Sequence, residues 1–220
     1  MQTDSGRKKV VREVGGNAGV IVDETADLDW AVSRLVFGAF AYAGQVCISV
    51  QRIFVVESIY PEFERRFVEK VRQVKVGDPL DPATEMGPLT SPMHRDRVLS
   101  YVKVALDEGA EILAGGKGPD DPARSRGCHL EPTDVRADPS SRVGQEEVFG
   151  PFVTVTTFSS DEQALAIANG TDYGLGGGLW TTDLSRAHRT AAAIRSGMVW
   201  INSYKRVSPG SPFGGTGLSG

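Results

Sequence analysis

Three short segments of the chain combine reactive or charged side chains with tight turns. Glu13 stands at the edge of a glycine turn in Glu13-Val-Gly-Gly-Asn17, and Cys47 ends the segment Gly44-Gln-Val-Cys47. An acidic pair opens the third segment, Glu146-Glu-Val-Phe-Gly-Pro151. A thiolate is a nucleophile, and a carboxylate near an apolar site can act as a base at neutral pH. These residue types are suited to forming a thioester on a cysteine and hydrolysing it with an activated water.

The chain has two cysteines, Cys47 and Cys128, and no C-x-x-C pair. Two cysteines in 220 residues are too few for a disulfide-stabilised secreted domain, so we expect reduced thiols in a cytoplasmic protein. No histidine is spaced to complete a zinc site with them, and we expect no metal. Cys47 lies in a predicted loop between a helix and a strand, whereas Cys128 lies in a strand-like stretch. We therefore expect Cys47 to be the more reactive thiol, the alternative being two inert thiols.

Composition and charge argue against two kinds of partner. The chain is 40% hydrophobic and 24% charged, which is typical of a soluble globular protein. A net charge of −4 argues against a broad basic face for nucleic acid. No run approaches the roughly 18 apolar residues that a membrane helix needs. No apolar segment follows the basic residues near the N-terminus, as a secretory signal would require.

The elements that position the three segments alternate between strand and helix patterns. Strands are predicted at residues 19–22, 52–56, 111–114, 152–158, 178–180 and 198–201. Helices are predicted at residues 27–44, 61–74, 91–108, 160–169 and 183–195. The polar segment 115–127, rich in Gly, Pro and Asp, is predicted to be an exposed loop.

Strands separated by helices imply parallel pairing with right-handed crossovers. We therefore predict an α/β fold of three layers (αβα), in which helices cover both faces of a mostly parallel, open, twisted sheet. No internal repeat is present and no linker is long enough to divide the chain, so one domain is predicted over residues 1–220.

The ordered motifs resemble those of the aldehyde dehydrogenase superfamily. Its signature E-[LV]-G-G-[KN] matches Glu13 to Asn17, and its G-Q-x-C matches Gly44 to Cys47. Further matches are Val76 to Pro82, Met86 to Pro88, Glu146 to Pro151, Asn202, Pro212 to Gly215, and Ser219-Gly220. The resemblance runs from about Gly6 to Gly220 and is to the catalytic, second half of full-length members.

The resemblance implies roles for four residues. Cys47 would attack the aldehyde carbon to give a thiohemiacetal, and its own backbone N–H would contribute to the oxyanion hole. Glu13 would activate the water that hydrolyses the resulting thioester. Glu147 would hold hydroxyls of the nicotinamide ribose of NAD or NADP, and Phe149 would pack beside the nicotinamide ring. Glu146 is expected to be a structural partner.

The resemblance also implies a substrate pocket near the C-terminal end of the chain. Asn202 and Phe213 would shape the floor of the active site. Arg206 lies on the loop that lines the substrate entrance in the family, where a guanidinium could bind the carboxylate of a short anionic aldehyde. The alternative is that Lys205 and Arg206 face solvent.

The half that precedes the Glu13 motif in full-length members, and with it the cofactor-binding domain, is expected to be absent. We therefore expect NAD or NADP to bind this chain weakly. The implied function is oxidation of a small aldehyde, complete only with the cofactor domain, in a protein that the family suggests is a homodimer or homotetramer. The alternatives are a catalytically silent domain and cofactor-independent hydrolysis of esters or thioesters.

Overall fold

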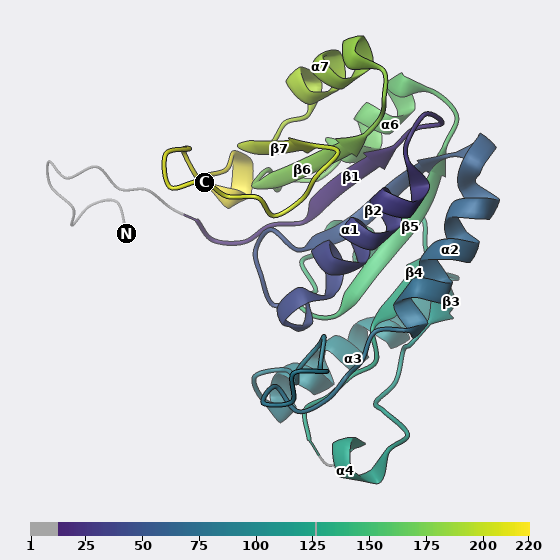
Figure 1. The fold of residues 1–220 in the computed structure, drawn as a ribbon, viewed down its shortest axis with the longest axis vertical. Coiled ribbons are helices and arrows are strands. Elements are labelled where there is room, and N and C mark those ends of the chain that lie inside the picture. The colour runs from purple at the N-terminus through teal and green to yellow at the C-terminus, as the bar shows by residue number, and fades with distance from the viewer. Residues whose placement is uncertain (1–12, 126) are drawn as a thin grey trace, which may run out of the picture.

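The computed structural model describes residues 13–125 and 127–220. Within them, one seven-stranded sheet has the order β3-β4-β5-β2-β1-β6-β7 (Figure 1). Its strands are β1 (Ala18–Val22), β2 (Val50–Val56), β3 (Glu111–Ala114), β4 (Thr133–Arg136), β5 (Phe152–Phe158), β6 (Gly176–Trp180) and β7 (Met198–Ile201). Neighbouring strands are parallel except β3 and β4, which pair antiparallel.

Helices cover both faces of the sheet, with α1 and α2 on one face and α6 and α7 on the other (Figure 1). The longer helices are α1 (Leu28–Phe40), α2 (Tyr60–Arg72), α3 (Pro92–Asp107), α6 (Asp161–Ala168) and α7 (Leu184–Ala193). Shorter turns are α4 (Pro122–Ser125), α5 (Arg142–Gln145), η1 (Ala41–Gly44), η2 (Glu57–Ile59) and η3 (Gly217–Ser219). The predicted three-layer αβα fold with a mostly parallel sheet is confirmed.

Apolar side chains of the central strands point alternately to the two faces of the sheet. In β1, Val20 and Val22 join the apolar core beneath α1 and α2, whereas Ile21 joins the core beneath α6 and α7. In β2, Ile53 faces the first core and Phe54 the second. Successive side chains of a strand point to opposite faces, so a continuous apolar run supplies both cores.

Side-chain caps begin the helices where the sequence indicated them. The Asp27 carboxylate accepts a hydrogen bond from the backbone N–H of Trp30 at 3.1 Å. The Ser160 hydroxyl accepts from the N–H of Gln163 at 3.2 Å, and the Gln163 amide oxygen accepts in return from the N–H of Ser159 at 2.8 Å. These bonds satisfy N–H groups that the first helical turn leaves without partners.

Strand β4 was not predicted, and the strand-like stretch expected around Cys128 is wrong. Residues 128–132 form no strand, although the Cys128 carbonyl accepts from the N–H of Leu89 at 2.9 Å. The strand begins at Thr133 and includes Asp134, a residue type that strands disfavour. Pairing on both sides, with β3 and β5, overrides that local preference.

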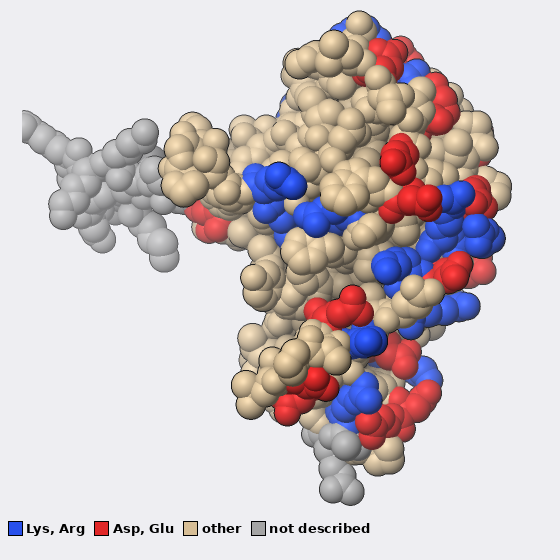
Figure 2. Space-filling view, viewed as in Figure 1, with Lys and Arg blue, Asp and Glu red and all other residues tan. Residues whose placement is uncertain are grey.

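The charged side chains on the face seen in Figure 2 are of both signs and gather over α2 and the elements below it. On α2, Glu62 lies 2.8 Å from Arg65 and 2.6 Å from Arg66. Such exposed pairs contribute little to stability, at most about 1 kcal/mol each. Among the described helices, none is both long and apolar enough to cross a lipid bilayer.

Candidate active site

The predicted catalytic and cofactor residues precede three neighbouring strands of the sheet. Glu13 comes before β1, Cys47 before β2, and Glu147 and Phe149 before β5. Since β5, β2 and β1 are adjacent and parallel, their preceding loops meet at the amino edge of the sheet. Ligands of open α/β sheets usually bind at the carboxyl edge, so this site uses the opposite one.

Three residues with left-handed backbone conformation lead from the helix into the loop of Cys47. The predicted helix over 27–44 ends at Phe40, and Tyr42 and Ala43 follow with φ of 58° and 54°. Gly44 continues with φ of 67°, and a Cβ atom there would lie 1.9 Å from the carbonyl oxygen of Gly150. Only glycine fits this position, so the loop packs directly against the segment that carries Glu147 and Phe149.

The glycine turn after Glu13 passes between Cys47 and Glu147. A Cβ atom on Gly16 would lie 2.3 Å from the Cys47 carbonyl oxygen, and one on Gly15 would lie 2.7 Å from Oε2 of Glu147. The Gly16 N–H donates to Oε1 of Glu147 at 2.9 Å. The structure therefore brings the three segments together, as their chemistry requires.

The thiol of Cys47 is half-buried and faces the carboxylate of Glu13. Burial, followed by the hydrogen bond to Glu13 and the negative charge of that carboxylate, raises the pKa of Cys47 to about 11. The backbone N–H groups of Ile48 and Cys47 act in the opposite direction because they stabilise a thiolate. At neutral pH the resting group is thus a thiol, and it lies beside an exposed carboxylate.

The two adjacent glutamates have different surroundings. Glu146 accepts a hydrogen bond from the Tyr101 hydroxyl at 2.8 Å and pairs with Arg142 at 2.9 Å. Glu147 turns toward Gly16, and burial raises the pKa of its carboxyl. These contacts agree with Glu146 as the structural partner, and they leave Glu147 with acceptor capacity beyond its one backbone bond.

Helix α3 holds the segment that carries Glu147 and Phe149. Arg97 donates to the carbonyl oxygens of Val148 and Glu147 at 2.9 and 3.1 Å. His94 bonds through Nε2 to the carbonyl oxygen of Phe149 at 2.7 Å, and the two rings meet edge to face at 6.1 Å. Sequence reasoning gave His94 no role and did not single out Arg97. The two residues are three positions apart and so share one face of α3, and this spacing was the only sign in the sequence that they act together.

A buried guanidinium fixes the start of β1. Arg52 donates to the Asn17 carbonyl at 2.9 and 3.1 Å, and to the carbonyls of Ile167 and Ala168 at the end of α6. Burial lowers its pKa to about 10. The Asn17 side chain also donates to the Gly144 carbonyl at 3.1 Å, so the turn that carries Glu13 is held from two sides.

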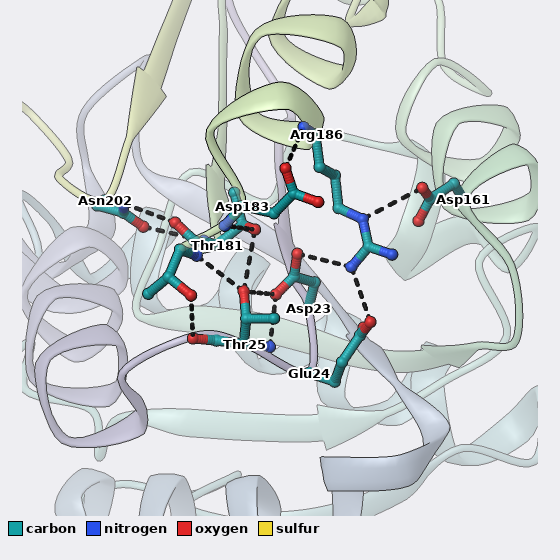
Figure 3. A network of polar contacts seen from close by, with 9 residues as sticks. Asp23, Glu24, Thr25, Asp161, Thr181, Asp183, Arg186 and Asn202 are labelled. Carbon is teal, nitrogen blue, oxygen red and sulfur yellow. Dashed lines mark hydrogen bonds and ion pairs between the residues drawn. The ribbon is translucent and has the colours of Figure 1, made fainter.

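Asn202, predicted to shape the site floor, follows β7 at the carboxyl edge of the sheet. Its side chain accepts from the N–H of Thr181 at 2.9 Å and donates to the Thr181 carbonyl at 2.8 Å (Figure 3). The Trp30 indole donates to the Asn202 carbonyl at 2.9 Å. Its contacts therefore join β6, β7 and α1 and do not reach Cys47.

The remaining predicted pocket residues lie on the loop that follows Asn202. Arg206 is exposed, and its carbonyl accepts from the Trp200 indole at 2.8 Å. The side chain of Phe213 is 41% exposed. No contact described for either side chain joins it to Cys47. It is Lys205 whose side chain turns inward on this loop, with a buried Nζ.

A hollow of about 1310 Å³ lies away from these residues, between segments 71–84 and 112–132. His129 and the charged side chains of Lys75 and Glu131 line it. Within residues 13–125 and 127–220, no three His, Cys, Asp or Glu side chains gather in an arrangement that could hold a metal ion.

The aldehyde dehydrogenase family model matches residues 1–220. The chain belongs to the aldehyde dehydrogenase family. It is 40% identical over 222 residues to betaine aldehyde dehydrogenase of Bacillus subtilis, covering 100% of this chain and 45% of that protein. Betaine aldehyde dehydrogenase of Cereibacter sphaeroides is 41% identical, over 98% of this chain and 44% of its own length. The chain thus spans less than half the length of these relatives.

Solved aldehyde dehydrogenase structures match just as fully. A structure described as a putative aldehyde dehydrogenase from Burkholderia cenocepacia is 54% identical with a TM-score of 0.96, covering 99% of this chain and 45% of that one. PnpE from Pseudomonas sp. WBC-3 gives the same values, and one of its structures is a complex with nicotinamide adenine dinucleotide. These matches confirm the resemblance drawn from the motifs.

Proposed function

We propose that this chain supplies the nucleophile and the base for NAD(P)-dependent oxidation of an aldehyde to a carboxylate. The observation that carries the proposal is the meeting of the Glu13 carboxylate with the Cys47 thiol, while two backbone N–H groups face the same sulfur. Because the chain spans 44–45% of its relatives, the complete reaction is assigned to a longer protein that adds a cofactor domain.

In the first step, Sγ of Cys47 bonds to the aldehyde carbon and the thiol proton is released to solvent. The carbonyl oxygen gains negative charge, and the N–H of Cys47 is available to stabilise it. Because the pKa of the thiol is about 11, very little thiolate is present at neutral pH, so the proton leaves as the carbon–sulfur bond forms.

The cofactor site that this chain can offer is the nicotinamide end. Glu147 retains carboxylate acceptors for ribose hydroxyls, and the Phe149 ring is half-buried beside it. When bound, NAD or NADP supplies the acceptor for the hydride of the aldehyde. Because Glu147 and Phe149 would contact only the nicotinamide end, we propose that this chain alone binds the cofactor weakly. The choice between NAD and NADP belongs to the rest of the longer protein.

In the last step, Glu13 removes a proton from water, which attacks the thioester carbon. The bond between that carbon and Sγ breaks, the carboxylic acid leaves and loses its proton to solvent, and the Cys47 thiolate takes the proton that Glu13 holds. The exposure of Glu13 supports this role, because water can reach its carboxylate directly.

We also propose a compartment, a domain organisation and an oligomeric state. Both cysteines are free, which fits a reducing cytoplasm. The single sheet and its two flanking cores favour one catalytic domain over residues 1–220. A homodimer or homotetramer is proposed for the longer protein, from the family alone.

Two assays on this chain separate the proposal from its alternatives. Reduction of NAD and NADP by a small aldehyde is measured at high cofactor concentration, and hydrolysis of p-nitrophenyl acetate is measured without cofactor. We expect slow cofactor reduction and ester hydrolysis, both lost in Cys47→Ala and both retained in Cys128→Ala. Ester hydrolysis alone would favour a cofactor-independent hydrolase, and neither activity would favour a catalytically silent domain.

A further inference from the structure

Lys205 has an unusual position on the loop that follows β7. Its backbone is left-handed, with φ of 56°, and its side chain turns inward while the neighbouring Arg206 is exposed. The Nζ atom is buried and has no hydrogen-bond partner among the described residues. Burying an ammonium without an acceptor is costly, so buried lysines are normally paired.

Arg52 shows how this fold treats a buried cation with a structural role. Its guanidinium donates to three backbone carbonyl oxygens. Lys205 instead has the ring of Phe37 on α1, whose centroid lies 6.0 Å from Nζ. An aromatic face attracts a cation but accepts none of its N–H groups as a carboxylate would. The N–H groups of Lys205 therefore have no acceptor among the described residues.

The loop of Lys205 packs beside the loop of Cys47: the Tyr204 hydroxyl oxygen and the Ile48 side chain lie 3.4 and 3.6 Å from the same point, the position of a Cβ atom on Gly176. Burial lowers the pKa of Lys205 to about 8, and the negative charge that Cys47 carries as a thiolate raises it in part. The preceding residue, Tyr204, is fully buried, and burial together with nearness to Cys47 raises its pKa. The loop thus returns from the carboxyl edge toward the nucleophile, with a charged amine at neutral pH.

We propose that the Lys205 ammonium binds a carboxylate on the substrate, which makes the substrate class a short aldehyde with an anionic group. The proposal rests on the proposed function, since it places the aldehyde carbon at Cys47. It also moves the role that the sequence suggested for Arg206 to its buried neighbour. The same charge disfavours a cationic aldehyde, such as the one for which the betaine aldehyde dehydrogenases are named.

A matched pair of alkylating reagents tests the proposal on this chain without cofactor. Iodoacetate carries a carboxylate, whereas iodoacetamide is neutral and nearly equal in size. Labelling rates of Cys47 and Cys128 are measured at pH 7 by peptide mass spectrometry, and the iodoacetate-to-iodoacetamide ratio is compared between variants. The variants are Lys205→Met, Lys205→Arg, and Arg206→Met as the exposed control, each checked by its melting temperature.

We expect Lys205→Met to lower the ratio at Cys47 about fivefold to tenfold, as loss of one nearby charge predicts. Lys205→Arg should preserve the ratio, Arg206→Met should leave it unchanged, and Cys128 should show no change in any variant. Folding should survive Lys205→Met because no hydrogen bond is lost. An unchanged ratio in Lys205→Met, or an equal fall in Arg206→Met, would overturn the anionic preference alone. A Cys47 that reacts with neither reagent would overturn both this proposal and the nucleophile assignment.

Discussion

The backbone of Gly16 lies against the carbonyl oxygen of Cys47, with only 2.3 Å between that oxygen and the place where a Cβ atom would stand. No side chain fits in this space, so the turn after Glu13 and the loop of Cys47 are held together as one unit. The distance between Glu13 and Cys47 therefore depends on Gly16, which has no side chain of its own.

Gly16→Ala should separate the two segments. The methyl group must displace backbone, which we expect to lower the unfolding free energy by about 1–3 kcal/mol. Displacement of Glu13 should lower Cys47-dependent ester hydrolysis about tenfold to a hundredfold. Denaturant unfolding and p-nitrophenyl acetate hydrolysis measure the two effects. Gly210→Ala is the control, because nothing lies within 4 Å of a Cβ atom there; equal effects of both substitutions would contradict the close approach.

Glu13→Gln should make Cys47 easier to ionise. Burial and Glu13 together raise the thiol pKa to about 11, and loss of the negative charge leaves burial as the main cause. The pKa of Cys47 should therefore fall, and alkylation by iodoacetamide at pH 8 should become faster. The pH profile of the alkylation rate measures this directly. A profile that stays in place, or moves to higher pH, would show that Glu13 does not act on the sulfur.

Asp134 should make the protein less stable as pH rises. It is fully buried on β4 between Ala114 and Val153, and neither carboxyl oxygen has a hydrogen-bond partner in the part of the chain that the structure describes. Burial, followed by the negative charge of Glu64, raises its pKa from 3.8 to about 8. The folded state thus keeps a proton that the unfolded state loses, and the unfolding free energy falls between about pH 4 and pH 8.

Asp134→Val should remove this part of the pH dependence and raise the unfolding free energy at pH 8 by about 1–3 kcal/mol. Urea unfolding at pH 5 and pH 8 provides the comparison, with the exposed Glu57→Gln as control. A variant that is less stable than the parent at pH 8 would show that the carboxyl has a partner in solution.

Arg186 should stabilise the carboxyl edge of the sheet through Asp23. Its guanidinium lies 2.9 Å from Asp23, whose side chain is 3% exposed, and also contacts Glu24 and Asp161 (Figure 3). Burial alone would raise the pKa of Asp23, but hydrogen bonds from Thr181, Arg186 and Thr25 outweigh it and lower the pKa. The stability from this carboxylate is therefore present at neutral pH and is lost as pH falls into the acid range.

Arg186→Met should leave Asp23 buried without its cation and cost about 2–4 kcal/mol of unfolding free energy at pH 7. Glu24→Gln removes only an exposed partner and should cost less than about 1 kcal/mol. Thermal unfolding of both variants gives the comparison. Equal losses would mean that the buried pair contributes no more than the exposed one.

The sequence predicted the layers well because the information is local. Runs of β-branched and aromatic residues such as Phe152–Phe158, and caps such as Asp27 and Ser160, specify elements without knowledge of their neighbours. Strand β4 could not be found in this way, because four residues that include Asp134 acquire strand structure only by pairing with β3 and β5.

The candidate site was predictable only in part. The motifs of Glu13, Cys47 and Glu147 were visible as residue types at fixed spacing. The side chains that hold them were not, because His94 and Arg97 act through backbone carbonyls some 50 positions away in the sequence. Nor could the sequence decide between Lys205 and Arg206, since the left-handed backbone at Lys205 and the burial of its Nζ atom are visible only in the structure.

The most direct measurement is the fate of an acyl group on Cys47. The chain and its Glu13→Gln variant are mixed with p-nitrophenyl acetate, quenched in acid and mapped by peptide mass spectrometry. If Cys47 is the nucleophile and Glu13 activates the hydrolytic water, the variant should accumulate an acetyl group on Cys47, whereas the parent should release it and show little. Acetylation of Cys128 instead, or equal acetylation of Cys47 in parent and variant, would contradict the assignment.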